Sequence, residues 1–300
     1  MEVRLGRINL NRQKQSLVLA IILNLSFALG ELLAGLFANS LTLISSSLHD
    51  LSDSGALTIA YFGLIMAQKR PSQKRTFGYK KMRILIAFLN AFILAVLTFI
   101  ILRFAILRLI HPATVQSSVL WLVAVIGIMV NGIAVLSLAR DRTSISIRIA
   151  MLHLLDDFLS WIAILIGGLM MQFLRWYIID PILSIGISLY VIYGAYKIFR
   201  ESASILIDST PKDLNFEVVR QFVLNFSKDV IDLHDLHIWT IGEGERALMA
   251  HIVVADNLIS SYHQLLSRLE CALKQEFQIT HVTLELECDK CKSGENVCKF

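Results

Sequence analysis

Two histidine–aspartate pairs lie within long apolar stretches of the sequence. His49 precedes Asp53 by four residues, and His153 precedes Asp157 by the same interval. On an α-helix, residues i and i+4 share one face, so each pair presents an imidazole beside a carboxylate. Two imidazoles and two carboxylates make a four-ligand set that suits tetrahedral Zn²⁺, and the two aspartates balance its charge. The spacing therefore predicts a site for a divalent cation, with zinc as the first choice.

The apolar surroundings make these aspartates costly unless something compensates for them. An aspartate at the centre of a spanning helix costs about 2.5–3.5 kcal/mol on insertion scales, and a bound dication would offset that cost. The alternative is that each pair forms an intrahelical hydrogen bond or a helix–helix contact. The same pattern occurs twice at matching depth, which favours the metal site. Asp50 and Asp156 lie on other parts of their helix surfaces, so we leave both out of the four-ligand set; a place behind the ligands, contact with water and ligation itself all stay open.

The chain is far more apolar than a soluble enzyme. Of its 300 residues, 55% are hydrophobic and 17% are charged, and the mean hydropathy is +0.63. About 20 apolar residues span a bilayer, and six segments reach that length. We therefore expect an α-helical membrane protein with six transmembrane helices, at 17–38, 41–67, 84–109, 118–139, 146–174 and 177–199.

Basic residues indicate the orientation of these spans. They gather before the first span, between the second and third, and between the fourth and fifth. The positive-inside rule places those segments and both termini in the cytoplasm, and it accounts for the net charge of +4 without nucleic-acid binding. The first apolar run is too long for a signal peptide and carries Glu31. Three interpretations of Glu31 stay open: it carries protons, it lies near the outer interface, or it pairs with Arg103.

The last third of the chain has the pattern of a water-soluble domain. A helix is predicted around 213–227, strands around 231–241 and 247–255, a second helix around 260–276 and a third strand around 279–287. This order is αββαβ. We expect a six-span transmembrane domain at 1–207, a cytosolic domain at 208–287 and a cysteine-containing tail at 288–300.

Histidines in the cytosolic domain form a second candidate site. Alternate residues of a strand share a face, so His234, His251 and either His281 or Glu285 are expected to converge on the sheet. The alternative is that these histidines are half-buried and bonded to the backbone. In the tail, Cys288 and Cys291 form a lone C-x₂-C pair whose thiolates are candidate zinc ligands.

Several short segments, taken in order, resemble the cation diffusion facilitator family. They are Asn39–Leu43 leading into His49–Asp53, Thr76–Tyr79, Leu152-His153 with Asp157, Asp180-Pro181-Ile182, and His234–Trp239. The resemblance covers nearly the whole chain. It implies that His49, Asp53, His153 and Asp157 are the transport ligands, that the protein is a homodimer, and that protons are the counter-ion.

The resemblance also implies a ferredoxin-like cytosolic domain that contacts its partner copy and binds regulatory metal. The His-Asp/His-Asp combination looks like the members that prefer zinc over manganese or iron. The loop between the fourth and fifth spans lacks a histidine-rich run, which favours a bacterial exporter in the inner membrane.

Two functions from other classes remain as alternatives. An intramembrane metalloenzyme would keep one position on Zn²⁺ open for water, but no H-E-x-x-H motif occurs in the sequence, so no enzyme activity is expected. A membrane-bound metal sensor would use only the cytosolic domain and would tolerate loss of the intramembrane aspartates. Among transported cations, the ligand types alone do not separate zinc from cadmium, cobalt, nickel, manganese or iron.

Overall fold

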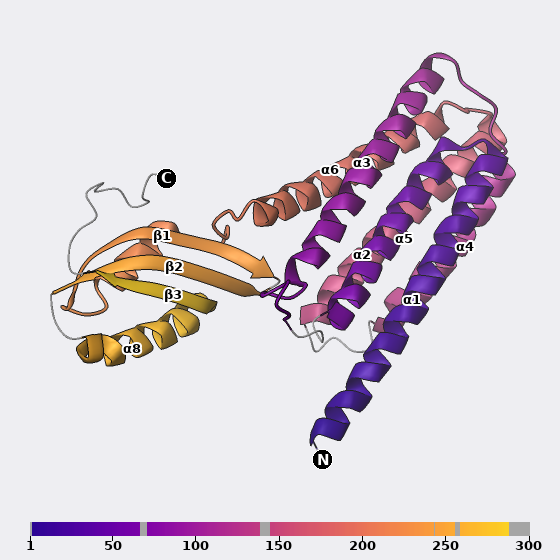
Figure 1. The fold of residues 1–300 in the computed structure, drawn as a ribbon. Coiled ribbons are helices and arrows are strands. Elements are labelled where there is room, and N and C mark those ends of the chain that lie inside the picture. Colours follow the sequence, from indigo (N-terminus) through magenta and orange to yellow (C-terminus); the bar gives the residue numbers. More distant parts are fainter. Residues whose placement is uncertain (1, 67–70, 139–144, 243, 256–258, 288–300) are drawn as a thin grey trace. The chain divides into compact units, whose positions relative to one another are not determined.

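The computed structural model describes residues 2–66, 71–138, 145–242, 244–255 and 259–287 (Figure 1). The chain divides into two units. The helical unit comprises Met1–Phe62 and Leu89–Phe199, and the sheet unit comprises Gly63–Phe88 and Arg200–Phe300. The first two-thirds of the chain form α1 (Glu2–Ala38), α2 (Leu41–Met66), α3 (Lys80–Ile110), α4 (Ser117–Leu138), α5 (Ile145–Leu174) and α6 (Ile179–Leu206).

Several of these helices have the length and composition of membrane spans. Among the described residues there are four such helices: Val18–Ala38, Lys80–Ile110, Leu154–Leu174 and Ile179–Leu206. The described apolar part of α4 is shorter, and α2 carries a run of serines and ionisable residues that lowers its hydropathy. Large apolar side chains such as Phe99 and Phe173 are exposed, as a lipid-facing surface requires. The chain therefore has a helical transmembrane domain with several apolar helices.

The beginning of α2 is capped by an aspartate from α6. The Asp180 carboxylate is fully buried and accepts hydrogen bonds from the Ser40 hydroxyl at 2.6 Å and from the N–H groups of Leu41 at 2.9 Å and Thr42 at 3.1 Å. The Thr42 hydroxyl in turn donates to the Asp180 carbonyl at 2.9 Å. The first N–H groups of a helix have no partner within it, and its dipole favours a negative charge there. This anchor, from Ser40–Thr42 to Asp180, joins two of the segments on which the family resemblance rests.

Hydroxyl groups continue the contact between α2 and α6 below the anchor. The Ser45 hydroxyl lies 2.7 Å from that of Ser184 and 3.3 Å from that of Ser188, and all three residues are buried. Small residues let two membrane helices approach closely, and hydroxyls bond across such an interface. The helix that carries His49 and Asp53 is thus held against α6 by polar contacts.

Helix α5, which carries Asp157, packs closely on α4. Trp161 of α5 is buried, and a Cβ atom at Gly127 of α4 would lie only 2.3 Å from its ring. Around this contact, a core that includes Leu120, Ala124 and Ile164 fills the space between the two helices. The glycine therefore sets how closely α4 and α5 approach.

The sheet unit continues the chain with α7 (Phe216–Leu224), β1 (Val230–Gly242), β2 (Glu245–Val254), α8 (Ile259–Phe277) and β3 (Ile279–Glu287). The order in the sheet is β1-β2-β3, with β1 and β2 antiparallel and β2 and β3 parallel. A parallel pair needs a crossover connection, and α8 provides it. The order of elements is the αββαβ that the hydrophobic pattern predicts.

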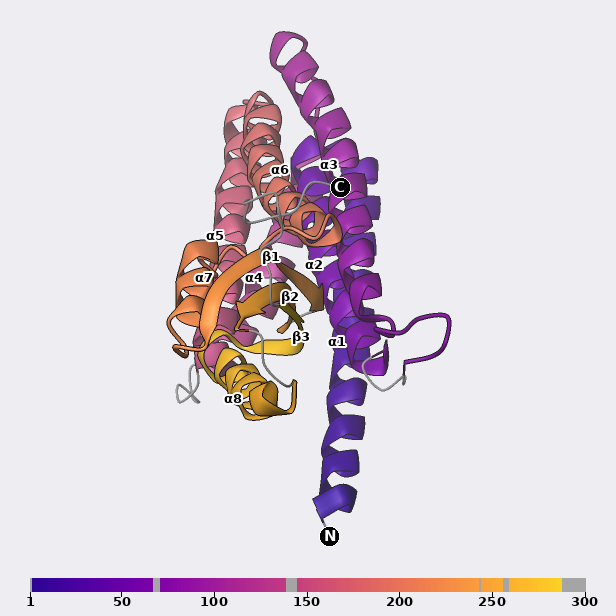
Figure 2. The same cartoon turned by 60° about the vertical axis from the view of Figure 1, so that its left-hand side comes forward.

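Both helices of the sheet unit pack on the same face of the sheet (Figures 1 and 2). Val219 of α7 and Leu269 of α8 share one core with Leu248, Ala250 and Ile252 of β2. Because successive residues of a strand point to opposite faces, the residues between them in β2 lie on the other face. That other face carries the histidine and glutamate side chains of the second candidate site.

Candidate metal centres

Three of the four predicted intramembrane ligands converge between α2 and α5. His49 Nε2 lies 3.5 Å from a carboxylate oxygen of Asp157 and 3.9 Å from one of Asp53. One donor atom from each of the three residues lies within 4.8 Å of the others. Zinc bonds to nitrogen and oxygen are about 2 Å long, so donors at these separations surround a space of the size of one ion.

The fourth predicted ligand, His153, belongs to α5 and precedes Asp157 by about one helical turn. Its backbone therefore lies on the same face of the helix as Asp157, while its side chain lies outside the described part of the structure. The His49, Asp53 and Asp157 side chains keep 22%, 26% and 14% of their surface exposed. Each of the three side chains is therefore only partly buried by the described residues.

A tyrosine of α6 adjoins this cluster. The Tyr190 hydroxyl donates a hydrogen bond of 2.6 Å to Asp156, and its ring lies edge-on to the His49 imidazole with 5.6 Å between centroids. The Asp156 carboxylate thus faces Tyr190. The sequence does not mark Tyr190 as part of this site, because a tyrosine in an apolar span carries no sign of which helix it faces.

Glu31 of α1 and Asp50 of α2 form a second acidic pair in the helical unit. The two residues interact with each other, and the Ser46 hydroxyl also acts on Glu31. Glu31 is buried, and neither of its carboxylate oxygens makes a hydrogen bond of ordinary geometry. The alternative in which Glu31 hydrogen-bonds to Arg103 is thus not found in this structure.

The sheet unit holds a second cluster of possible ligands. His234 and His251 are cross-strand neighbours on β1 and β2. The Glu287 carboxylate joins them, with one oxygen 3.1 Å from His234 Nε2 and the other 2.7 Å from His251 Nδ1. Glu285, which is opposite His251 in the strand register, lies 3.6 Å from His251 Nε2. The cluster is therefore rich in the nitrogen and oxygen donors that zinc accepts.

His281 lies away from this cluster. It pairs with Ala247 in the register, four residues before His251, and its ring packs edge-on against Phe77 at 5.4 Å between centroids. Of the two alternatives in the sequence, the structure brings Glu285 to His251 and leaves His281 apart. Glu287 was not predicted, although it shares the strand face of Glu285.

The predicted tail ligands Cys288 and Cys291 lie outside the described residues. Nothing in the described geometry bears on their role.

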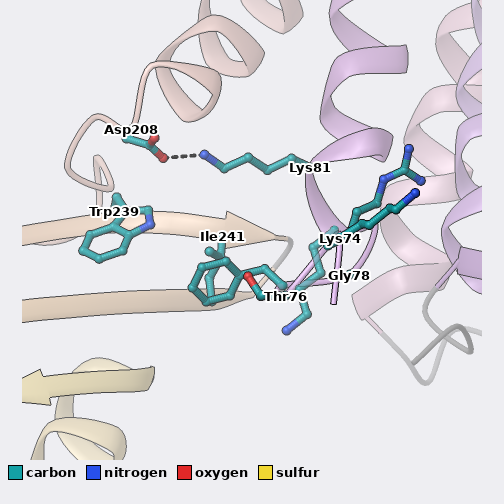
Figure 3. Close-up of a pocket in the computed structure, with 10 residues that line it drawn as sticks. Lys74, Thr76, Gly78, Lys81, Asp208, Trp239 and Ile241 are labelled. Atoms are coloured by element: carbon teal, nitrogen blue, oxygen red, sulfur yellow. Dashed lines mark hydrogen bonds and ion pairs between the residues drawn. The ribbon is translucent and has the colours of Figure 1, made fainter. Parts of the chain in front are cut away.

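A cavity in the sheet unit is lined by several basic residues, in contrast to the carboxylate-containing clusters (Figure 3). This cavity of about 390 Å³ is lined by Lys74, Lys80 and Lys81 among others. Lys81 pairs with Asp208 at 2.5 Å, and Lys80 pairs with Glu245. Ammonium groups have no lone pair for a metal and repel it, so this hollow is no metal site.

Two protein-family models match the chain. The model of the "Cation efflux transmembrane domain" matches residues 17–207, and that of the "Cation efflux protein, cytoplasmic domain" matches residues 211–288. The chain belongs to this cation efflux family of membrane proteins, and the resemblance seen in the sequence is confirmed.

Individual relatives match along both domains. "Metal cation efflux system protein CzcD" of Cupriavidus metallidurans is 31% identical over 96% of this chain and 90% of its own length. "Zinc transporter ZitB" of Pectobacterium atrosepticum is 32% identical over 95% of this chain and 88% of its own. A Bacillus subtilis "Cadmium, cobalt and zinc/H(+)-K(+) antiporter" is 31% identical over 94% and 91%. Metal cation efflux is therefore the function of this chain at the level of its family.

Proposed function

We propose that this protein exports Zn²⁺, or a closely similar divalent cation, from the cytoplasm in exchange for protons. The observation that supports this most directly is the convergence of His49, Asp53 and Asp157 from two helices far apart in the sequence. Relatives named as a zinc transporter and as a cadmium, cobalt and zinc antiporter support both the cation and the exchange.

The proposed transport site consists of His49, Asp53, His153 and Asp157. Two neutral imidazoles and two carboxylates supply four donors, and the carboxylates cancel the charge of the ion where few waters can. Asp156 stays outside this set, because its carboxylate is engaged by the Tyr190 hydroxyl. In this arrangement zinc is the transported substrate, and the helices α2 and α5 each contribute one pair of ligands.

We further propose that α1 to α6 are six membrane spans, with both termini in the cytoplasm of a bacterial cell and the spans in its inner membrane. The basic segments before α1, between α2 and α3, and between α4 and α5 support this orientation. The proposed domains are 1–207, 208–287 and 288–300. The cytosolic domain, with the αββαβ order of a ferredoxin-like fold, would join two copies into a homodimer.

Exchange for protons follows from the chemistry of the site. Histidine binds zinc only when neutral, so binding of metal and binding of protons exclude each other. Inside-out vesicles with an acidic lumen are therefore expected to accumulate zinc, with about one or two protons leaving for each ion that enters. A zinc-sensitive dye inside the vesicles measures this, and a protonophore should stop it. Accumulation that ignores lumenal pH, and that follows ATP or potential alone, would contradict proton exchange.

The imidazoles should also set the preference for zinc. Replacing His49 by aspartate gives the site one more oxygen ligand, which suits harder cations such as Mn²⁺. We expect the ratio of manganese to zinc flux in proteoliposomes to rise, by about tenfold for a change of roughly 1.4 kcal/mol in relative affinity. An unchanged ratio would mean that residues outside the four ligands determine selectivity.

We also propose that His234, His251 and Glu287, with Glu285 nearby, bind a regulatory zinc ion in the cytosol. The close approach of Glu287 to both imidazoles supports this. Glu287→Gln should lower zinc binding by about one ion per chain at low free zinc, since one ligand of the set is lost. Zinc titration of the purified protein measures it, with the exposed Glu276→Gln of α8 as the control. Equal zinc content in the two variants would exclude Glu287 as a ligand.

A further inference from the structure

We propose that Tyr190 of α6 is a positioning residue that holds the Asp156 carboxylate away from the transported ion and so contributes to the preference for zinc. The inference rests on the proposed four-ligand transport site, and it adds a residue that adjoins this site without binding the ion. It also explains why a further carboxylate beside the ligands is not one of them.

This tyrosine contacts both helices that carry the ligands. Its hydroxyl donates a hydrogen bond of 2.6 Å to Oδ2 of Asp156 on α5. Its ring lies edge-on to the His49 imidazole of α2, with 5.6 Å between centroids. A hydrogen bond of this length from a hydroxyl to a carboxylate is among the stronger ones in proteins. Tyr190 therefore links a carboxylate of α5 to a metal ligand of α2.

The packing of α6 on α2 keeps Tyr190 in this place. Val191, the next residue of α6, is buried in one core with Leu48, which directly precedes His49. The hydroxyl contacts of Ser45 with α6 belong to the same interface. The backbone at Tyr190 is thus fixed against the helix that carries His49.

Asp156 has the position and the chemistry of a ligand, yet its carboxylate is turned elsewhere. It directly precedes Asp157 and follows His153 by three residues, and residues three or four apart are neighbours on a helix surface. Among the described residues of the helical unit, the donors that gather within 4.8 Å of one another belong to His49, Asp53 and Asp157. A carboxylate inside a membrane helix needs a partner, and the tyrosine hydroxyl is the one it has here.

A further carboxylate on the ion would change which cations the site prefers. Two imidazoles and two carboxylates suit tetrahedral Zn²⁺, whereas Mn²⁺ prefers more oxygen ligands in an octahedral arrangement. By occupying Asp156, the Tyr190 hydroxyl keeps the site at four ligands, half of them nitrogen. Loss of this hydroxyl frees Asp156 to bind the ion, and the preference then shifts toward manganese.

Tyr190→Phe tests this, because it removes the hydroxyl and keeps the ring. The residue is 54% exposed, so the change leaves no buried cavity. Groups that hold metal ligands from outside are worth about 10–100-fold, so we expect the ratio of manganese to zinc flux in proteoliposomes to rise by about tenfold. The rise should come from a lower KM for manganese, whereas a loss of folded protein would lower the maximal rates of both ions alike. Tyr193→Phe, at a tyrosine of the same helix that is 70% exposed, should match the wild type.

A second substitution shows whether the effect passes through Asp156. Tyr190→Phe combined with Asp156→Asn should return the flux ratio to the wild-type value, because the carboxylate that joins the ion is gone. An unchanged ratio in Tyr190→Phe overturns the proposal, and so does a ratio that stays raised in the double variant. If Tyr190→Phe does not assemble, Tyr190→Leu with and without Asp156→Asn gives the same comparison. A wild-type protein that carries no zinc overturns the proposed function itself, whereas a zinc-selective wild type with an unchanged Tyr190→Phe overturns the role of Tyr190 alone.

Discussion

Replacing Asp157 by alanine is expected to abolish zinc efflux while the protein still reaches the membrane. The substitution removes a donor within 3.5 Å of His49 Nε2 and one of the two negative charges that balance the ion. Even residues that only support metal ligands are worth about 10–100-fold in affinity or activity, so loss of a ligand should cost at least about 100-fold in flux. Asp53→Ala should behave in the same way, because Asp53 supplies the other charge.

Zinc flux into proteoliposomes measures the effect, with protein content matched. The neighbouring Asp156→Ala is a matched control, since it removes a carboxylate from the same helix that is bound to Tyr190 rather than to the cluster. It should retain a substantial part of the flux. Transport at the wild-type rate by Asp157→Ala would refute the site, and it would leave a sensor confined to the cytosolic domain as the better interpretation.

Asp180→Ala is the second change with a large expected effect, here on stability. It removes the acceptor of three hydrogen bonds at the beginning of α2 and leaves buried donors of Ser40, Leu41 and Thr42 unsatisfied. Each buried donor without a partner costs about 1–3 kcal/mol, so the helical unit should lose about 3 kcal/mol or more. Arg108, 3.8 Å from the carboxylate, would also lose its nearest negative charge in the anchor.

Thermal unfolding in detergent, followed by circular dichroism, measures this loss. Asp180→Asn keeps one acceptor oxygen in a side chain of the same shape, so it should fall between wild type and the alanine variant. An alanine variant with the wild-type unfolding midpoint would show that the anchor adds nothing to the stability of the bundle. Zinc flux at 25 °C should fall with the fraction of protein that remains folded.

The hydrophobic pattern of the sequence predicted the helices and strands. The four-residue spacing within one helix predicted which two ligands that helix contributes to the intramembrane site. His49 and Asp53 share a helical face by spacing alone, but the approach of Asp157 to His49 depends on how α2 and α5 pack. The sequence showed the Asp180 motif but not that Asp180 caps the beginning of α2. This cap comes from another helix, so it depends on a tertiary contact that local sequence does not reveal. The polar residues of α2 also lower its hydropathy, so α2 is not among the described helices that are apolar enough to span a membrane.

The cytosolic cluster shows a different limit. The sequence left His281 and Glu285 as alternatives, since both lie on the same face of one strand. Only the parallel register, with Glu285 opposite His251 and His281 opposite Ala247, decides between them. The sequence does not reveal the register between β2 and β3, because α8 lies between the two strands and determines where β3 begins.

Because the Asp180 anchor fixes only the beginning of α2, any tilt of this helix about the anchor displaces its far end most. Asp53 lies twelve residues beyond Leu41, about 18 Å at 1.5 Å per residue, so a tilt of about 10° moves it by about 3 Å. Ser45, four residues from the pivot, moves by only about 1 Å in the same tilt, and its hydroxyl has Ser184 and Ser188 as alternative partners. Zinc bonds of about 2 Å do not survive a 3 Å displacement. A tilt of this size would thus be enough to break zinc bonds at Asp53 while the hydrogen bonds near Leu41 are kept.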